Sequence, residues 1–161
     1  MIFFWMGWKI RNLGKKKGLR ALRGDPLNVE ALRSIEGKPA SLAGAKRAVF
    51  YFYPKDDTPG CTIEAKEFTQ REKEFSMRGV KVFGVSADGP ESHKAFCDKF
   101  GITFPLLMDS GGRVGRELGN WRGINHARTT VLVDASGHIL ELWDNVKAQG
   151  HAQAVLDSLG A

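Results

Sequence analysis

The stretch YFYPKDDTPGCTIEA, residues 51–65, places an aromatic run next to a polar loop that carries two prolines and a cysteine. The overlapping run KRAVFYFY, residues 46–53, is apolar without interruption after its two basic residues, which predicts a buried β-strand. Residues 62–78 then have the composition of a helix. One apolar stripe at helical spacing is formed by Cys61, Ala65, Phe68 and Phe75. The stretch therefore predicts a strand, a loop and a helix, with a cysteine where the helix begins.

Strands and helices alternate along the rest of the chain. A short strand is expected at residues 28–35, and a proline begins and a glycine follows a helix expected at residues 90–100. Further strands are expected at residues 80–87, 102–109, 128–134 and 138–143, and further helices at residues 113–119 and 151–160. This order of elements predicts an α/β fold, with a central mixed β-sheet flanked by helices.

Cys61 follows the carboxyl end of a predicted strand, where open α/β sheets tend to place functional groups. In the first turn of a helix, unpaired backbone N–H groups and the positive end of the helix dipole favour a thiolate over a thiol. The thiolate is the form of cysteine that attacks electrophiles. A single cysteine is more often a small buried hydrophobe, but a position directly after Pro59 and Gly60 favours a nucleophile.

The net charge of +6 is unevenly distributed along the 161 residues. Residues 1–24 hold seven basic residues and no acidic one, so the remainder is close to neutral. A nucleic-acid-binding domain normally carries its basic stripe on the folded surface, so we expect no nucleic-acid partner. The change in composition near Gly24 predicts a basic, aromatic tail at residues 1–24 and one globular domain at residues 25–161.

The first eight residues, MIFFWMGW, are rich in aromatic side chains and precede the basic cluster. This order is typical of a weak contact with a membrane surface, and a start assigned too far upstream or a frayed terminus is the alternative explanation. It is the reverse of the order in a secretory signal, and the apolar stretch is too short for a membrane helix. We therefore expect a cytoplasmic protein that is free or peripherally bound to a membrane.

Other polar residues give weaker indications. The four histidines, His93, His126, His138 and His151, lack the spacing of a metal-binding motif, so no metal is expected. Asp56 and Asp57 are interpreted as turn residues. Trp121 is expected either to line the mouth of the site or to pack beneath it.

Pro54, Thr58 and Cys61 have the spacing P-x-x-x-T-x-x-C after an aromatic strand. This pattern resembles the active-site signature of the peroxiredoxins, and FYPKDDTPGCT is closely similar to the Q-type, or bacterioferritin-comigratory, subfamily. The similarity runs from about Val29 to the C-terminus. It implies a thioredoxin-like fold and a monomer that reduces hydrogen peroxide and organic hydroperoxides without a cofactor. The family's usual N-terminal pattern, G-x-x-A-P-x-F, is not visible.

The resemblance also implies roles for individual residues. Cys61 matches the cysteine that attacks the peroxide, Thr58 the residue that orients the peroxide, and Pro54 the residue that shields the thiolate from water. Arg128 matches an arginine that reaches the site from a later strand, where its permanent charge can hold the thiolate and the peroxide oxygens together. Glu64, one helical turn after Cys61, matches an acid that often orients this arginine.

The sequence allows two interpretations of a second, resolving cysteine. Many Q-type members carry it five residues after the first cysteine, where this chain has Lys66. Cys97 is then the only candidate, and it lies on the second helix, a location used by another branch of the subfamily. Its stripe also contains His93, Phe96 and Phe100, so Cys97 is expected either to resolve the sulfenic acid of Cys61 or only to pack in the core.

These patterns leave three functions open. In the first, Cys61 and Cys97 form an intramolecular disulfide that thioredoxin or a similar thiol reductant reduces. In the second, Cys61 acts alone and an external thiol reduces its sulfenic acid. In the third, the chain is a redox sensor or a binding module recruited to membranes. The complete set of Pro54, Thr58, Cys61 and Arg128 favours a hydroperoxide-reducing enzyme, because a sensor has less need of both Thr58 and Arg128.

Overall fold

The computed structural model describes residues 19–160 and contains one mixed, five-stranded β-sheet with the order β3-β2-β1-β4-β5. The central strand β1 (Arg47–Phe52) runs parallel to β2 (Val80–Ser86) and antiparallel to β4 (Thr129–Asp134). The edge strand β3 (Leu106–Met108) is parallel to β2, and the other edge strand, β5 (Ile139–Trp143), is antiparallel to β4. The predicted α/β fold with a mixed sheet is confirmed.

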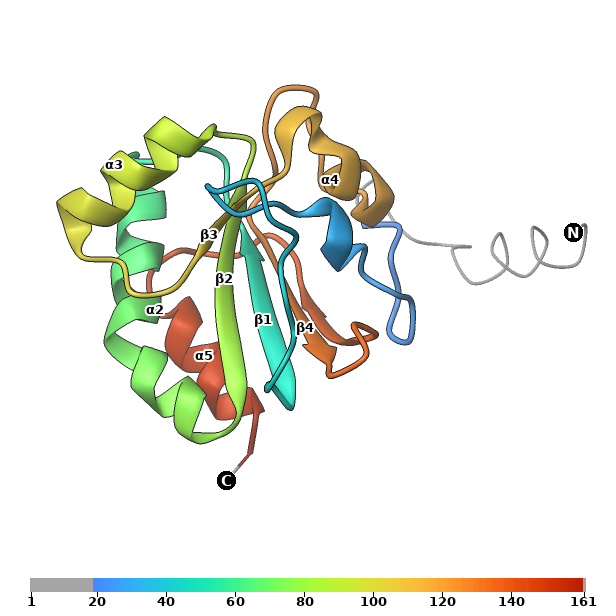
Figure 1. Ribbon diagram of the computed structural model, residues 1–161. Helices are drawn as coiled ribbons and strands as arrows, with labels where there is room; N and C mark the ends of the chain where they lie inside the picture. Colours follow the sequence, from blue (N-terminus) through green and yellow to red (C-terminus); the bar gives the residue numbers. More distant parts are fainter. Residues whose placement is uncertain (1–18, 161) are drawn as a thin grey trace, which may run out of the picture.

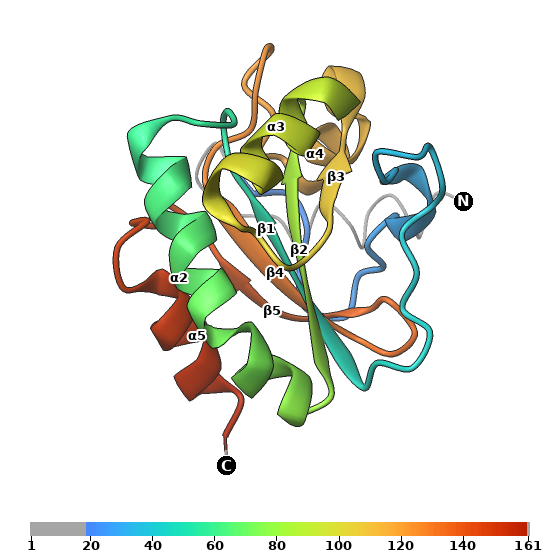
Figure 2. The ribbon, with the colours of Figure 1, turned by 60° about the vertical axis from the view of Figure 1, so that its left-hand side comes forward.

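Helices lie on both faces of this sheet (Figure 1). The long helix α2 (Pro59–Met77) packs beside α5 (His151–Ser158) on one face, and α3 (Pro90–Phe100) lies near the N-terminal end of α2 (Figure 2). The short helix α4 (Arg113–Leu118) lies on the other side of the sheet. Two 3₁₀ turns, η1 (Val29–Ala31) and η2 (Ser110–Gly112), complete the elements.

The side chains of β1 supply both hydrophobic cores, because successive residues of a strand point to opposite faces. Val49 and Tyr51 belong to the core under α2 and α5, and Phe50 and Phe52 belong to the core on the other face. All four are fully buried. Burial on both faces explains why this strand is apolar without interruption, and the strand is therefore a rigid support for the loop that follows it.

Local signals predicted several element boundaries. The helix expected at residues 90–100 is α3, which ends at Gly101 with a left-handed φ of 65°. The helix expected at residues 62–78 is α2, and it begins earlier, at Pro59. Proline suits a first helical position because its φ is already helical and the N–H that it lacks has no partner there. Cys61 therefore lies inside the first turn of α2.

The prediction of a strand at residues 28–35 was wrong. This segment contains the 3₁₀ turn η1, in which the Leu32 N–H donates to the Val29 carbonyl, and it forms only isolated bridges, from Arg33 to Pro39 and to Met108. β3, which it meets, has three residues, and Pro39 has no N–H with which to extend a ladder. The apolar residues are used for packing rather than for pairing.

The described part of the N-terminal segment contacts the sheet and α4. The N–H groups of Arg20 and Ala21 both donate to the Leu118 carbonyl, and the Gly24 N–H donates to the Ile139 carbonyl. The tail predicted at residues 1–24 lies largely outside the described residues, so the boundary before the domain at residues 25–161 stays a prediction. Within residues 19–160, every helix is too short or too polar to cross a lipid bilayer.

Candidate active site

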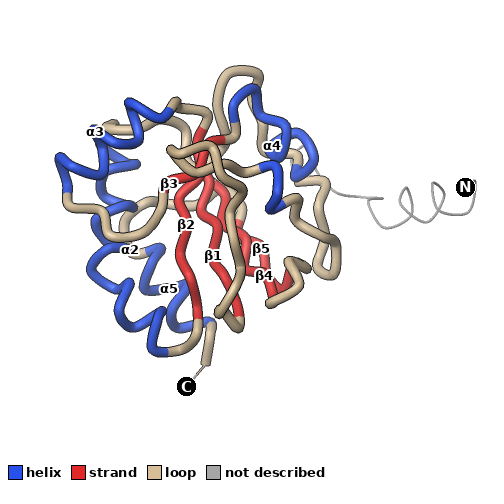
Figure 3. Tube along the Cα trace, viewed as in Figure 1, coloured by secondary structure: helices blue, strands red, loops and turns tan. Residues whose placement is uncertain are grey.

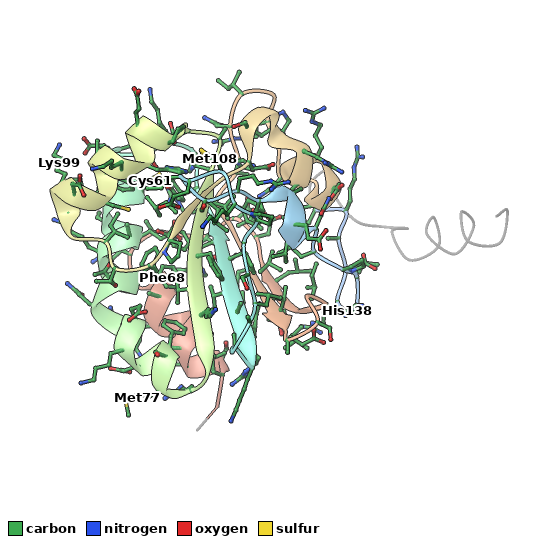
Figure 4. The ribbon with its side chains drawn as sticks, in the orientation of Figure 1. Cys61, Phe68, Met77, Lys99, Met108 and His138 are labelled. Carbon is green, nitrogen blue, oxygen red and sulfur yellow. The ribbon has the colours of Figure 1, made fainter. Side chains whose placement is uncertain are left out.

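The loop between β1 and α2 carries the sequence motif to one end of the sheet (Figure 3). Thr58 is the N-cap residue of α2, and Cys61 follows in the first turn with 1% of its surface exposed. Figure 4 shows Cys61 at the end of α2 that lies next to α3. The unpaired N–H groups and the helix dipole at this end of α2 favour a negative charge on sulfur.

Arg128 joins Cys61 to Glu64. It directly precedes β4, which is antiparallel to β1, so its side chain reaches the carboxyl end of β1. Its Nη2 donates to Cys61 Sγ at 3.4 Å, and its Nη1 donates to Glu64 Oε1 at 2.7 Å. Burial lowers the pKa of Arg128, but Glu64 and Cys61 outweigh that effect and the net shift is upward. A permanent positive charge therefore lies against the sulfur.

Gly60 makes this approach of the guanidinium possible. A Cβ atom at Gly60 would lie 3.0 Å from Arg128 Nη2, closer than such contacts normally are. A larger residue would therefore push Arg128 away from the start of α2. The sequence motif showed a glycine before the cysteine, but its packing against Arg128 depends on a contact with a distant segment.

Glu64 is a buried acid, one helical turn from Cys61. Its side chain is 0% exposed, and its Oε2 atom has no partner among the described residues. Burial raises the pKa of Glu64 to about 7, although the neighbouring charge of Arg128 acts in the opposite direction. Glu64 therefore exists in both protonation states near neutral pH, and its ionised state holds Arg128 by an ion pair.

Thr58 and Pro54 lie in the same loop and are partly buried. The Thr58 hydroxyl donates its proton to the Lys55 carbonyl at 2.8 Å and makes no capping bond to α2. A hydroxyl that has donated its proton still has lone pairs with which to accept a hydrogen bond. Thr58 can therefore accept a hydrogen bond from a hydroxyl or hydroperoxide group near Cys61.

Asp56 lies in a turn, as the sequence indicates, and its buried side chain has a further role that the sequence did not reveal. Its side chain is 3% exposed and accepts hydrogen bonds from Tyr53 at 2.6 Å and from Ser92 at 2.8 Å, and its Oδ2 lies 2.6 Å from His93 Nδ1. Buried tyrosine and histidine side chains need polar partners, and Asp56 is the group that satisfies them. Asp57 fits the turn interpretation, with a left-handed φ of 56°.

Cys97 lies on α3, partly buried, and packs against the core that contains Cys61. Both cysteines are free thiols. Burial, followed by the negative charges of Asp56 and Asp98, raises the pKa of Cys97 to about 11. Cys97 is therefore a thiol rather than a thiolate at neutral pH in this arrangement, and it is a weak nucleophile.

The AhpC/TSA family model matches residues 27–142, most of the chain. The chain belongs to this family. Among curated proteins, it is 41% identical to Peroxiredoxin Bcp of Xanthomonas campestris over 141 residues, covering 76% of this chain and 88% of the relative. It is 40% identical to the chloroplastic Peroxiredoxin Q of Sedum lineare, covering 71% of this chain and 64% of the relative. These relatives assign the chain to the Q-type peroxiredoxins.

Solved structures agree with this assignment. A cysteine-to-serine variant of PrxQ from Xylella fastidiosa matches with a TM-score of 0.77 and 35% identity, covering 86% of this chain and 94% of that one. Xanthomonas campestris Peroxiredoxin Q matches with a TM-score of 0.72 and 38% identity, covering 80% and 87%. The chain is thus a peroxiredoxin enzyme with a thioredoxin-like fold.

In this peroxiredoxin, Lys66 lies five residues after Cys61, at the position where many Q-type members carry the resolving cysteine. Its Nζ lies 5.1 Å from the centroid of the Phe100 ring, and Lys99 Nζ lies 5.2 Å from the same centroid. These are cation–π contacts, and the first of them links α2 to α3. The residue in place of a cysteine therefore helps to dock the helix that carries Cys97.

One group of side chains in the described part of this peroxiredoxin has the spacing of a metal site: Asp56, Asp88 and His93, whose ligand atoms lie within 4.8 Å of one another. These atoms already bind within the protein. Asp88 Oδ2 accepts from Ser86 Oγ and from the Asp56 N–H, and His93 Nε2 binds the Leu107 carbonyl. The three side chains therefore belong to a hydrogen-bond network within the protein.

Trp121 is partly buried in the peroxiredoxin fold and packs against Gly112 and against the ring of His126, whose centroid lies 5.0 Å from that of the indole. His126 in turn binds Asp109 at 2.7 Å. These contacts show Trp121 as a packed side chain, and its place relative to the mouth of the site stays a prediction. No local pattern marks the Asp109–His126 pair, because the two residues lie on separate segments that only the fold brings together.

Proposed function

We propose that Cys61 is the nucleophile with which this chain reduces hydrogen peroxide and organic hydroperoxides. The contact between Arg128 Nη2 and Cys61 Sγ carries the proposal, because it holds a permanent cation against a buried sulfur at a helix N-terminus. Work on the Xanthomonas campestris bacterioferritin comigratory protein concerned its alkyl peroxide reduction activity. This relative supports the same substrate class here.

In the first step, the Cys61 thiolate attacks one oxygen of the hydroperoxide. The S–O bond forms as the O–O bond breaks, and the leaving oxygen takes up a proton and departs as water or an alcohol. Arg128 stabilises the negative charge as it moves from sulfur to oxygen. Thr58 accepts the hydrogen bond that orients the peroxide, and Pro54 limits the access of water. The product is a sulfenic acid on Cys61.

In the second step, the Cys97 sulfur attacks the sulfenic sulfur of Cys61. The S–S bond forms, the S–O bond breaks, and hydroxide leaves with the thiol proton as water. Two cysteine-to-serine variants of Xanthomonas campestris Peroxiredoxin Q have solved structures. The two substituted cysteines are separated along that chain by the same number of residues as Cys61 and Cys97 are here, which supports this pairing. Thioredoxin, or a similar dithiol, then reduces the disulfide.

A one-cysteine cycle is the second candidate. The observation in its favour is that Cys97 lies on a separate helix with a pKa raised to about 11 by burial and by nearby carboxylates. In that cycle an external thiol attacks the sulfenic acid directly, and Cys97 only packs in the core.

Turnover measurements separate the two cycles. We expect Cys61→Ser to abolish peroxide reduction with every reductant. Cys97→Ser should keep a normal first oxidation of Cys61 but lose turnover with thioredoxin. Full turnover of Cys97→Ser with thioredoxin would instead establish the one-cysteine cycle.

We further propose that the enzyme works as a monomer in the cytoplasm and that residues 1–24 make a weak contact with anionic membranes. The basic and aromatic composition of that segment supports the contact. Co-sedimentation with anionic vesicles tests it, with a chain that begins at Asp25 as the control. The membrane contact is wrong if both chains stay in the supernatant.

A further inference from the structure

Two adjacent aspartates in the loop between β1 and α2 hold opposite ends of α3. Asp56 contacts Ser92 and His93 in the first turn of this helix. Asp57 forms an ion pair with Lys99 in the last turn at 2.8 Å. Figure 4 shows Lys99 on α3, away from Cys61. We refer to these five residues as the α3 clamp, and Cys97 lies between its two ends.

The buried end of the clamp is the stronger one. His93 Nε2 lies 2.9 Å from the Leu107 carbonyl, which can only accept, so Nε2 carries a proton. His93 Nδ1 and Asp56 Oδ2 lie 2.6 Å apart, and their side chains are 0% and 3% exposed. If α3 moves away, Asp56 loses these bonds while its neighbours stay buried, and unpaired buried polar groups are costly.

The exposed end of the clamp is weaker. Lys99 and Asp57 are 59% and 47% exposed, so water screens their attraction. The contact of Lys66 with Phe100 adds a second link from α2 to the same end of α3. The two ends together predict that α3 opens more readily near Cys97 than at its first turn, and that full release requires the loss of the Asp56 bonds.

We propose that the α3 clamp sets the rate at which Cys97 reaches the sulfenic acid of Cys61. This inference rests on the proposed function, in which Cys97 is the resolving cysteine. Asp56 and His93 are then positioning residues, which act on the reaction through α3 and touch neither the peroxide nor Cys61. Each opening of the clamp exposes Cys97, and each closure returns α3 to the arrangement in which Cys61 reacts with peroxide.

The surroundings of Cys97 support this role. While α3 is held, Asp56 is the second cause, after burial, of the raised pKa of Cys97. Opening removes both effects at once, because it exposes Cys97 to water and separates it from Asp56. The same movement therefore brings Cys97 within reach of Cys61 and makes its sulfur more reactive.

Hydrogen exchange on the reduced, full-length protein measures the clamp directly. Asp56→Asn keeps the shape of the side chain but replaces one acceptor oxygen with a donor, so it cannot satisfy Tyr53, Ser92 and His93 together. We expect about tenfold faster exchange of the amides in α3, the factor for one lost buried hydrogen bond, with unchanged exchange in α5. Lys94→Ala is the matched control, because it removes the Lys94–Asp98 pair within α3 and leaves the clamp intact.

A second variant keeps the test valid if Asp56→Asn does not fold. Asp57→Asn removes the charge that binds Lys99, and asparagine tolerates the left-handed φ of 56° at this position. We expect a smaller increase in α3 exchange for this variant, by a factor of about two to five, as for an exposed ion pair. Unchanged exchange of α3 in both variants would overturn the clamp.

Kinetics then connect the clamp to the reaction. Stopped-flow oxidation with hydrogen peroxide should give an unchanged first phase, the oxidation of Cys61, and a faster second phase, disulfide formation, in Asp56→Asn. Faster α3 exchange with an unchanged or slower second phase would overturn the proposal. Intact mass distinguishes failure of the proposed function from failure of the clamp. If neither wild type nor variant forms the Cys61–Cys97 disulfide, the two-cysteine cycle is wrong. The proposed role of the clamp is then wrong as well.

Discussion

Arg128 determines the electrostatics of the site, because its two terminal nitrogens bind Cys61 and Glu64 on successive turns of α2. A guanidinium offers two donors in a fixed fork, and a lysine ammonium offers only a point charge on a flexible stem. Both contacts therefore depend on arginine specifically. The sequence alone marks Arg128 only through family resemblance, since a single arginine before a strand is otherwise a common surface residue.

Replacing Arg128 with lysine tests this dependence. We expect Arg128→Lys to lower the second-order rate constant of Cys61 with hydrogen peroxide by about 100-fold or more, the range for loss of one preorganised donor to a developing charge. Stopped-flow kinetics measure this constant. Arg122→Lys is the control, because Arg122 binds only its own loop through Asn125 and His126. Equal rate constants for wild type and Arg128→Lys would contradict this role.

Glu64 makes stability depend on pH. Burial raises its pKa from 4.5 to about 7 against the effect of Arg128. The folded state then binds more protons than the unfolded state between these two pH values, so stability falls as pH rises through this window. We expect the free energy of unfolding of wild type, relative to Glu64→Gln, to fall by about 3 kcal/mol between pH 4.5 and pH 7.5.

Urea unfolding of both proteins over this pH range measures the difference. His151 acts in the opposite direction, because burial and then Arg128 lower its pKa to about 4, but it is present in both proteins and cancels. A difference that stays constant or grows with pH would contradict the assignment to Glu64.

At the scale of elements, the boundaries of α3 are local and its contacts are not. Pro90 and Gly101 determine where α3 begins and ends, and the sequence predicted both. The partners of Asp56 lie directly after β1, on α3 and in the loop after β2, and the sequence indicated only the turn at this residue. The sequence therefore predicts the boundaries of this helix but not the tertiary hydrogen bonds that hold it in place.

Substitution of two glycines with left-handed φ distinguishes the cost of backbone strain alone from the cost of strain together with a steric clash. Gly101 has a φ of 65° and open space around it, whereas Gly112 has a φ of 70° and a Cβ there would overlap the indole ring of Trp121. We expect Gly101→Ala to cost about 1 kcal/mol of stability and Gly112→Ala about 3 kcal/mol or more. Urea unfolding measures both. Equal losses would contradict the packing of Trp121 on Gly112.

At the scale of the whole molecule, the apolar run at residues 46–53 determined the architecture, because a strand buried on both faces lies at the centre of a sheet. β1 is that strand, and the loop after it carries Pro54 and Thr58 and leads into the first turn of α2, where Cys61 lies. The strand expected at residues 28–35 failed, because a short apolar segment at the sheet edge can pack without pairing. The contacts of Arg128 depended on the antiparallel pairing of β1 with β4, which no local pattern reveals.

The central claim is that Cys61 reacts with peroxide and Cys97 resolves the product. Intact mass of the reduced protein, treated with one equivalent of hydrogen peroxide and then with an alkylating reagent, tests both parts most directly. We predict the loss of two hydrogens with both thiols blocked from alkylation. Addition of oxygen at Cys61 with Cys97 still open to alkylation, or two thiols that both remain free, would contradict the account.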